Sequence, residues 1–203
     1  MAKSLKRIAF IVSIGTLISK AAGLVRQLVI AAAFGVGAAY DAYNYAYVLP
    51  GFLLILLGGI NGPFHTAMVS VLSRRPPEER AHVLTVINTL VSISLGIVTL
   101  VLIFCADPLI SLVGPGLSSE VHQIATVQLQ LMAPIALLAG LIGLGFGFLN
   151  ASEEFLVPAI SPLISSLALI FGVGLFWLKV GPETSSTDLA LQGGIVLACA
   201  TCI

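Results

Sequence analysis

Two cationic side chains, Lys20 and Arg26, interrupt an apolar stretch near the start of this 203-residue chain. A charge in hydrocarbon costs at least ~2.5 to 3.5 kcal/mol, so such residues usually face a polar cavity or a partner. Arginine presents a planar fork for bidentate phosphate binding, and lysine presents a compact cation. The pair predicts a transporter of an anionic substrate, with a phosphate ester as the favoured anion. The alternative, that either side chain snorkels to an interface instead of facing a cavity, is less favoured.

On an ideal helix the two cations lie ~9 Å apart along the axis and ~120° apart around it. They cannot share a narrow stripe, but both can face a wide cavity. Asp41 is the only acid in the first 77 residues. It is interpreted either as a solvated or helix-capping residue or as a pairing or gating partner of Arg26.

Asn61 and His65 lie four residues apart and share one helix face. A neutral, hydrogen-bonded packing role is favoured for His65 over a proton-linked role. Together with Lys20, Arg26 and Asp41, these two residues complete the candidate substrate-binding set. No hydrolytic or nucleophilic constellation is visible, so we expect a non-enzyme without a cofactor. The C-x-x-C that ends at Cys202 has no second pair and no nearby His, so no metal site is expected.

The composition predicts an all-α polytopic membrane protein. Hydrophobic residues make up 58% of the chain and charged residues 9%, whereas soluble domains carry about 25% charged residues. A membrane-spanning helix needs ~20 apolar residues. The expected spans are 7–35, 42–73, 83–106, 121–150, 156–178 and an incomplete 189–203. We therefore expect residues 1–203 to form a six-helix N-terminal lobe whose last helix is truncated. The net charge of zero gives no reason to expect a nucleic-acid partner.

The distribution of positive residues predicts a cytoplasmic N-terminus. The loop around Asp41 and the loop expected at 107–120 contain no lysine or arginine. Six positive residues lie at the start of the first span, before it, or between the second and third spans: Lys3, Lys6, Arg7, Arg74, Arg75 and Arg80. Cytoplasmic loops carry such an excess. Trp177 and four tyrosines are interpreted as interfacial aromatics at outer span ends: Tyr40, Tyr43, Tyr45 and Tyr47.

Glycine and proline predict where helices break or pack closely. Gly58, Gly59, Gly62 and Pro63 fall within the second span, which is therefore not expected to be one straight helix. In the fourth span, the Gly143-x-x-x-Gly147 spacing allows close helix contact, and ordinary bundle packing is the favoured interpretation.

Specific segments resemble the MurJ/MviN lipid II flippases of bacteria, within the multidrug/oligosaccharidyl-lipid/polysaccharide exporter superfamily. The most specific runs from Ser19 to Pro50 and reads SKAAGLVRQLVIAAAFGVGAAYDAYNYAYVLP. It is similar to the family's first helix, first outer loop and second helix. Further similarities lie in Gly114–Leu117, which resembles an A-P-G-F loop element, in Phe148–Asn150, and in Phe155, Pro158, Ala159 and Pro162.

The resemblance implies a two-lobed fold of about fourteen helices around a central cavity. It also implies transport of lipid II, a polyprenyl diphosphate bearing a disaccharide-pentapeptide, to the outer leaflet of the bacterial plasma membrane by alternating access. The partners would be lipid II, membrane lipids and a missing C-terminal lobe. Arg26 falls on a family cavity arginine and Asp41 on a family acid. Lys20 stands where arginine is usual and Gln27 where aspartate often follows.

Two other functions stay open at this point. The chain could belong to another transporter of the superfamily that exports a different polyprenyl-linked oligosaccharide or a drug, although Lys20 and Arg26 would repel a cationic drug. It could also be a non-transporting scaffold or an inactive truncated remnant, because half of a two-lobed transporter cannot enclose a cavity.

Overall fold

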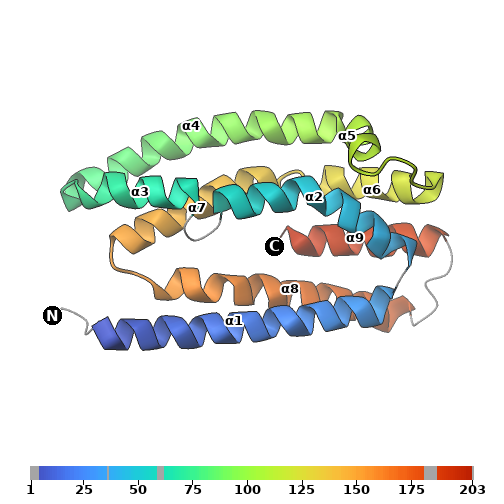
Figure 1. Cartoon of the computed structure of the whole chain (residues 1–203), viewed down its shortest axis with the longest axis horizontal. Helices are drawn as coiled ribbons and strands as arrows, with labels where there is room; N and C mark the ends of the chain where they lie inside the picture. Colours follow the sequence, from blue (N-terminus) through green and yellow to red (C-terminus); the bar gives the residue numbers. More distant parts are fainter. Residues whose placement is uncertain (1–4, 36, 59–61, 181–186, 203) are drawn as a thin grey trace.

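The computed structural model describes residues 5–35, 37–58, 62–180 and 187–202, and this part of the chain contains nine helices and no strand (Figure 1). The all-α prediction is confirmed. The helices are α1 (Leu5–Phe34), α2 (Ala38–Gly58), α3 (Pro63–Ser73), α4 (Pro77–Phe104), α5 (Ala106–Val113), α6 (Ser119–Met132), α7 (Ile135–Ala151), α8 (Leu156–Val180) and α9 (Thr187–Thr201).

Five helical segments of the described chain are long and apolar enough to cross a membrane. They are Val12–Phe34, Ala38–Ser73, Glu78–Phe104, Ser119–Ala151 and Leu156–Lys179, and a shorter apolar helix covers Ala190–Thr201. Large apolar side chains on their outer surfaces are open to the surroundings, for example Phe104 at 82% and Leu178 at 76% exposure. Such a surface suits hydrocarbon rather than water.

Two of these segments are broken near their middle. The second ends as α2 at Gly58 and resumes as α3 at Pro63, as the sequence predicts. Proline begins a helix readily because its missing N–H is not needed in the first turn. The fourth segment divides at Pro134 into α6 and α7. Asn61 lies outside the described residues.

The segment 107–120, expected as a loop, contains most of α5. This short helix follows α4 at Cys105 and buries Ala106 and Ile110 against its neighbours. The apolar pair at a spacing of four marks one helical face, which the loop prediction overlooked. The turn that follows needs glycine at position 116, where φ is 89°.

The helices form two groups that α9 joins (Figure 1). α1 packs chiefly against α8. α2, α3 and α4 pack against α7, and α6 packs against α2. α9 contacts α2, α6 and α8. The largest buried cluster lies where α9 meets these groups and includes Phe34, Leu129, Leu169, Val173 and Leu197.

Glycines on α7 let it approach α2 and α3 at backbone distance. A Cβ on Gly143 would collide with the Leu57 carbonyl oxygen, and one on Gly147 would lie 2.9 Å from the His65 carbonyl oxygen. The predicted close contact at the Gly143-x-x-x-Gly147 spacing is confirmed.

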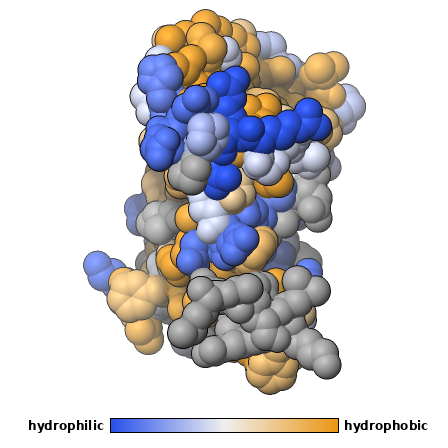
Figure 2. Space-filling view, turned by 90° about the vertical axis from the view of Figure 1, so that its left-hand side faces the viewer, coloured by the Kyte–Doolittle hydropathy of each residue, from blue (hydrophilic) through white to orange (hydrophobic). Residues whose placement is uncertain are grey.

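The helix ends alternate between two ends of the molecule (Figure 1). The start of α1, the α3–α4 junction and the α7–α8 junction lie at one end. The α1–α2 junction, with Asp41, and the α5–α6 junction lie at the other. Figure 2 shows hydrophilic side chains gathered at the first end, where Arg74, Arg75 and Glu79 are exposed.

Candidate functional site

Arg26 lies in the last third of α1 and is half-buried. Its Nε atom is buried and has no hydrogen-bond partner within the described part of the chain. Its charge is close enough to act on the hydroxyl groups of Tyr43 and Tyr47 on α2. A buried N–H without a partner is costly, so this position favours an acceptor that the described residues do not supply.

Three tyrosines of α2 form a stacked column beside this cation. The ring centroids of Tyr40 and Tyr43 lie 6.2 Å apart, and those of Tyr43 and Tyr47 lie 5.5 Å apart. The Tyr43 hydroxyl lies 3.1 Å from Oγ1 of Thr201 on α9. These side chains occupy one inward helix face at spacings of three and four. Tyr43 and Tyr47 are therefore partly buried against the interior of the chain, whereas Tyr45 is 37% exposed. The interfacial interpretation of these tyrosines stays a prediction.

Lys20 and Asp41 do not join Arg26 in one contact network. Lys20 is exposed on α1, and Asp41 is exposed in the first turn of α2, where a carboxylate is favoured by the helix dipole. The ion pairs within the described residues are Arg75–Glu79 and His122–Asp107. The structure thus brings Arg26 to the tyrosines rather than to Asp41.

His65 sits apart from the cations, buried on α3. Its Nε2 accepts a hydrogen bond of 2.7 Å from Nδ2 of Asn150 at the end of α7. Oδ1 of Asn150 is buried without a partner in the described chain. This contact joins α3 to α7, which is the packing role that the sequence favours for His65.

Gln128 is a buried polar residue that the sequence reasoning missed. It is fully buried on α6, and its Nε2 donates to the Ala39 carbonyl oxygen at 3.2 Å. Only its position along the helix indicates burial from the sequence, because it lies on the same face of α6 as Ile124, Leu129 and Met132. Asn150 and Thr201 were missed as well, since their partners lie 85 and 158 residues away in sequence.

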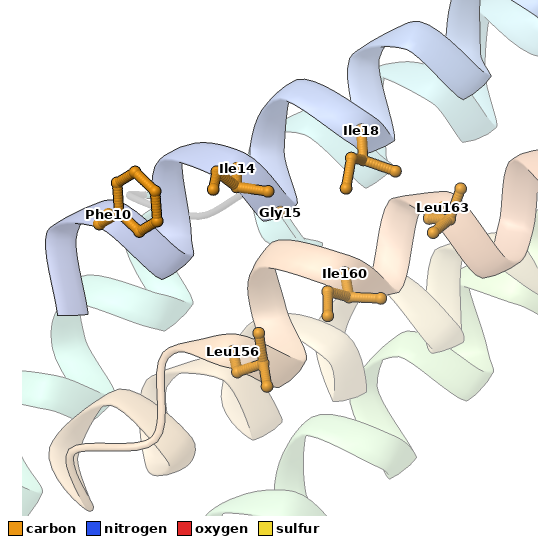
Figure 3. A pocket seen from close by; sticks show the side chains of 7 residues that line it. All are labelled: Phe10, Ile14, Gly15, Ile18, Leu156, Ile160 and Leu163. Carbon is orange, nitrogen blue, oxygen red and sulfur yellow. The ribbon is translucent and has the colours of Figure 1, made fainter. Parts of the chain in front are cut away.

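A small apolar groove lies between the first half of α1 and α8 (Figure 3). Its volume is about 220 Å³, and only carbon side chains line it: Phe10, Ile14, Ile18, Leu156, Ile160 and Leu163, with Gly15 at its base. Several of these side chains are largely exposed, including Phe10 at 66%. The groove offers nothing to bind a phosphate.

Comparison with known proteins agrees with this architecture. A sequence model of the family described as "Lipid II flippase MurJ" matches residues 30–203. The chain is 54% identical over 196 residues to the probable lipid II flippase MurJ of Synechocystis sp., covering 97% of this chain and 37% of that protein. It is 30% identical over 172 residues to the probable lipid II flippase MurJ of Thermotoga maritima, covering 82% and 35%.

A solved structure titled "Lipid II flippase MurJ, inward closed conformation" superimposes with a TM-score of 0.72 at 28% identity, covering 93% of this chain and 40% of that one. The chain thus spans about two fifths of the length of the relatives it matches. These relatives are flippases, that is, transporters rather than enzymes. By sequence and by fold, this chain belongs to the MurJ lipid II flippase family.

Proposed function

We propose that this chain forms part of the cavity of a flippase that carries lipid II from the cytoplasmic to the outer leaflet of a bacterial plasma membrane by alternating access. Its N-terminus lies in the cytoplasm, and Arg74, Arg75 and Arg80 face the same side. Lys20 and Arg26 bind the diphosphate. Asp41 contacts the substrate at the outer end of the helices, and Asn61 and His65 contact it from the second span.

The observation that carries this proposal is the setting of Arg26. Its Nε is buried without a partner in the described chain, and two tyrosine hydroxyls lie within reach of its charge. A phosphate oxygen would satisfy the guanidinium N–H through a charge-assisted hydrogen bond, which is about twice as strong as a neutral one. Because membrane surroundings lower the local dielectric, such a bond gains strength compared with water.

A chimera tests the role of Arg26. Residues 1–203 replace the matching segment of the Synechocystis relative, and the chimera is expressed in a strain depleted of its own flippase. We expect the unmodified chimera to restore growth and Arg26→Ala to abolish it, because the substitution removes all guanidinium donors. Arg26→Lys restores growth only in part, since a point cation lacks the bidentate geometry. Full growth with Arg26→Ala at normal protein abundance would remove this residue from the substrate site.

A double variant distinguishes substrate binding by Arg26 from an ion pair between Arg26 and Asp41. If Arg26 served only to pair with Asp41 in another state, then Arg26→Ala combined with Asp41→Ala would regain what Arg26→Ala alone loses. We expect no such recovery. Tyr45→Phe, an exposed change on the same helix as Asp41, is the matched control and leaves growth unaltered.

The chemical identity of the substrate is tested by the precursor pool. Loss of the chimera's function is expected to make lipid II accumulate in the depleted strain. An unchanged lipid II pool together with loss of another surface polysaccharide would assign the protein to a different polyprenyl-linked oligosaccharide. The purified chimera and the 203-residue chain alone are each reconstituted into vesicles, and an assay of lipid II translocation shows directly which of the two proteins moves lipid II.

A further inference from the structure

Three side-chain hydrogen bonds tie α2, α6 and α9 to one another in pairs. The Tyr43 hydroxyl on α2 lies 3.1 Å from Oγ1 of Thr201 on α9, and Gln128 on α6 donates to the first turn of α2. Sγ of Cys202, at the end of α9, donates to the Leu131 carbonyl oxygen on α6 at 3.3 Å. Because the three bonds close a ring of helices, they hold the Tyr43 hydroxyl in one place relative to α6 and α9.

The direction of the hydrogen bonds at Thr201 decides what the Tyr43 hydroxyl has left to offer. Oγ1 of Thr201 lies 2.7 Å from the Leu197 carbonyl oxygen, one turn earlier in α9. A carbonyl oxygen can only accept, and a hydroxyl has one hydrogen, so Thr201 donates to Leu197 and can only accept from Tyr43. The Tyr43 hydroxyl therefore donates to Thr201 and keeps only its lone pairs for other partners.

The cation of Arg26 lies near this hydroxyl oxygen but belongs to a different group of helices. Its charge acts on the hydroxyl groups of Tyr43 and Tyr47. One turn further along α1, Val29 and Ile30 lie in the same apolar cluster as the two tyrosines. α1 itself packs chiefly against α8. A hydroxyl oxygen held by α9 thus lies close to a donor carried by α1.

An oxygen that can only accept suits a guanidinium rather than a phosphate. Arginine has five N–H donors and no acceptor, whereas an ionised phosphate oxygen offers only lone pairs. While Thr201 engages its hydrogen, Tyr43 cannot donate to a diphosphate. It can accept from one N–H of Arg26 and leave the other donors for the substrate. A guanidinium that is already oriented loses less conformational freedom when it binds.

We propose that Tyr43 is a positioning residue for Arg26: its hydroxyl oxygen, oriented by Thr201, accepts from the guanidinium and keeps the other donors directed toward the diphosphate. The chain of donors runs from Arg26 through Tyr43 and Thr201 to the Leu197 carbonyl oxygen, and so joins α1 to α9 across α2. Bonds in such a chain polarise one another, so Thr201 contributes without touching substrate. The inference rests on the proposed role of Arg26 and adds two residues that act through it.

A double-mutant cycle in the purified chimera tests the contact between Arg26 and Tyr43. The Tm is measured for Arg26→Ala, for Tyr43→Phe and for the double variant. We expect the shift of the double variant to be smaller than the sum of the single shifts, because either substitution alone removes the same hydrogen bond. Tyr40→Phe removes a hydroxyl from the same stacked column and is the matched control, whose shift adds to that of Arg26→Ala. Additive shifts for Tyr43→Phe would overturn the proposal.

Binding of farnesyl diphosphate, a defined prenyl diphosphate, tests the effect on the site. Its Kd is measured by calorimetry with the chimera in detergent. We expect Tyr43→Phe and Thr201→Val each to raise the Kd about tenfold, a factor within the strength of a hydrogen bond to a charged group. Thr201→Ser loses a methyl group but keeps the accepting oxygen, so it should lower the Tm and leave the Kd unchanged. A Kd that follows the Tm rather than the oxygen at position 201 would reduce Thr201 to a packing residue and overturn the proposal.

The outcomes separate this inference from the proposed function. If Arg26→Ala weakens binding of the probe but Tyr43→Phe and Thr201→Val do not, the inference alone fails. If Arg26→Ala leaves the Kd unchanged, or the unmodified chimera does not bind the probe, Arg26 is not a diphosphate ligand and both proposals fail. If the Kd follows the oxygen at position 201 but lipid II does not accumulate on depletion, the proposed substrate fails while the positioning role stands.

Discussion

α7 and α1 are both apolar, glycine-containing helices, yet the chain uses them in opposite ways. Half of the residues are buried in an 18-residue stretch of the segment that contains α6 and α7, whereas 22% are buried in such a stretch of α1. On α7, Gly140, Gly143 and Gly147 all meet neighbouring atoms, whereas Gly23 on α1 meets none. Glycine in a membrane helix therefore marks close packing only where a neighbouring helix is present to use the space.

The difference separates a helix that fixes the fold from a helix that offers a surface. Overpacking α7 at Gly143 must move a neighbouring backbone, whereas a Cβ on Gly23 of α1 would have no atom within 4 Å to displace. Stability and transport should therefore respond to different substitutions. The following experiments test that separation in the chimera, in order of decreasing expected loss of stability.

The largest loss is expected for Gly143→Leu. The new side chain would collide with the Leu57 carbonyl oxygen, and backbone cannot rotate away as a side chain can. We expect destabilisation at or above ~3 kcal/mol, the upper end of ordinary overpacking, seen as low yield and a lower Tm in detergent. Gly145→Leu is the matched control, because a Cβ there meets no atom within 4 Å. An equal Tm for both variants would contradict the packing role of α7.

A smaller loss is expected for His65→Ala. It removes the 2.7 Å bond from Asn150 and leaves that buried amide without this partner, at a cost of about 1 to 3 kcal/mol. The double variant with Asn150→Ala should be less destabilised than the sum of the single variants, with a coupling of about 0.5 to 3 kcal/mol. Thermal unfolding measures all three, and Ser70→Ala on the exposed side of α3 serves as control. Strict additivity would show that the bond does not couple α3 to α7.

Arg80→Ala is expected to cost about 1 to 2 kcal/mol. Its guanidinium donates to the Arg75 and Ala151 carbonyl oxygens, each at 3.0 Å, and so binds the C-terminal ends of α3 and α7. Arg74→Ala, a change at an exposed neighbour, should stay within ~0.5 kcal/mol. Equal Tm values for the two variants would mean that Arg80 does not hold these ends together.

The smallest change in stability is expected for Lys20→Gln. The Lys20 side chain is exposed, and no ion pair within the described residues includes it. The free energy of unfolding should therefore change by no more than ~0.5 kcal/mol, which leaves the Tm almost unchanged. Growth complementation should nevertheless fall. Destabilisation comparable to that of His65→Ala would show that α1 packs through the face that carries Lys20 and would remove the contrast with α7.

The sequence predicts the features that depend on local spacing. The break before Pro63, the close approach at Gly143 and Gly147, and the divergence of Lys20 from Arg26 all follow from proline chemistry or from 3.6 residues per turn. The pairing of His65 with Asn150 does not follow, because the partners are 85 residues apart. The inward turn of Tyr43 and Tyr47 was also missed, since an amphipathic ring suits an interface as well as a partly polar core.

The break between α2 and α3 has a consequence for biogenesis. Backbone groups at a helix break need partners inside the bilayer, and α7 supplies the surface that meets both half-helices, at Gly58 and at His65. During synthesis from the N-terminus, α7 emerges some 80 residues after the break. The second span therefore gains its partner for the break only after the fourth span has been synthesised.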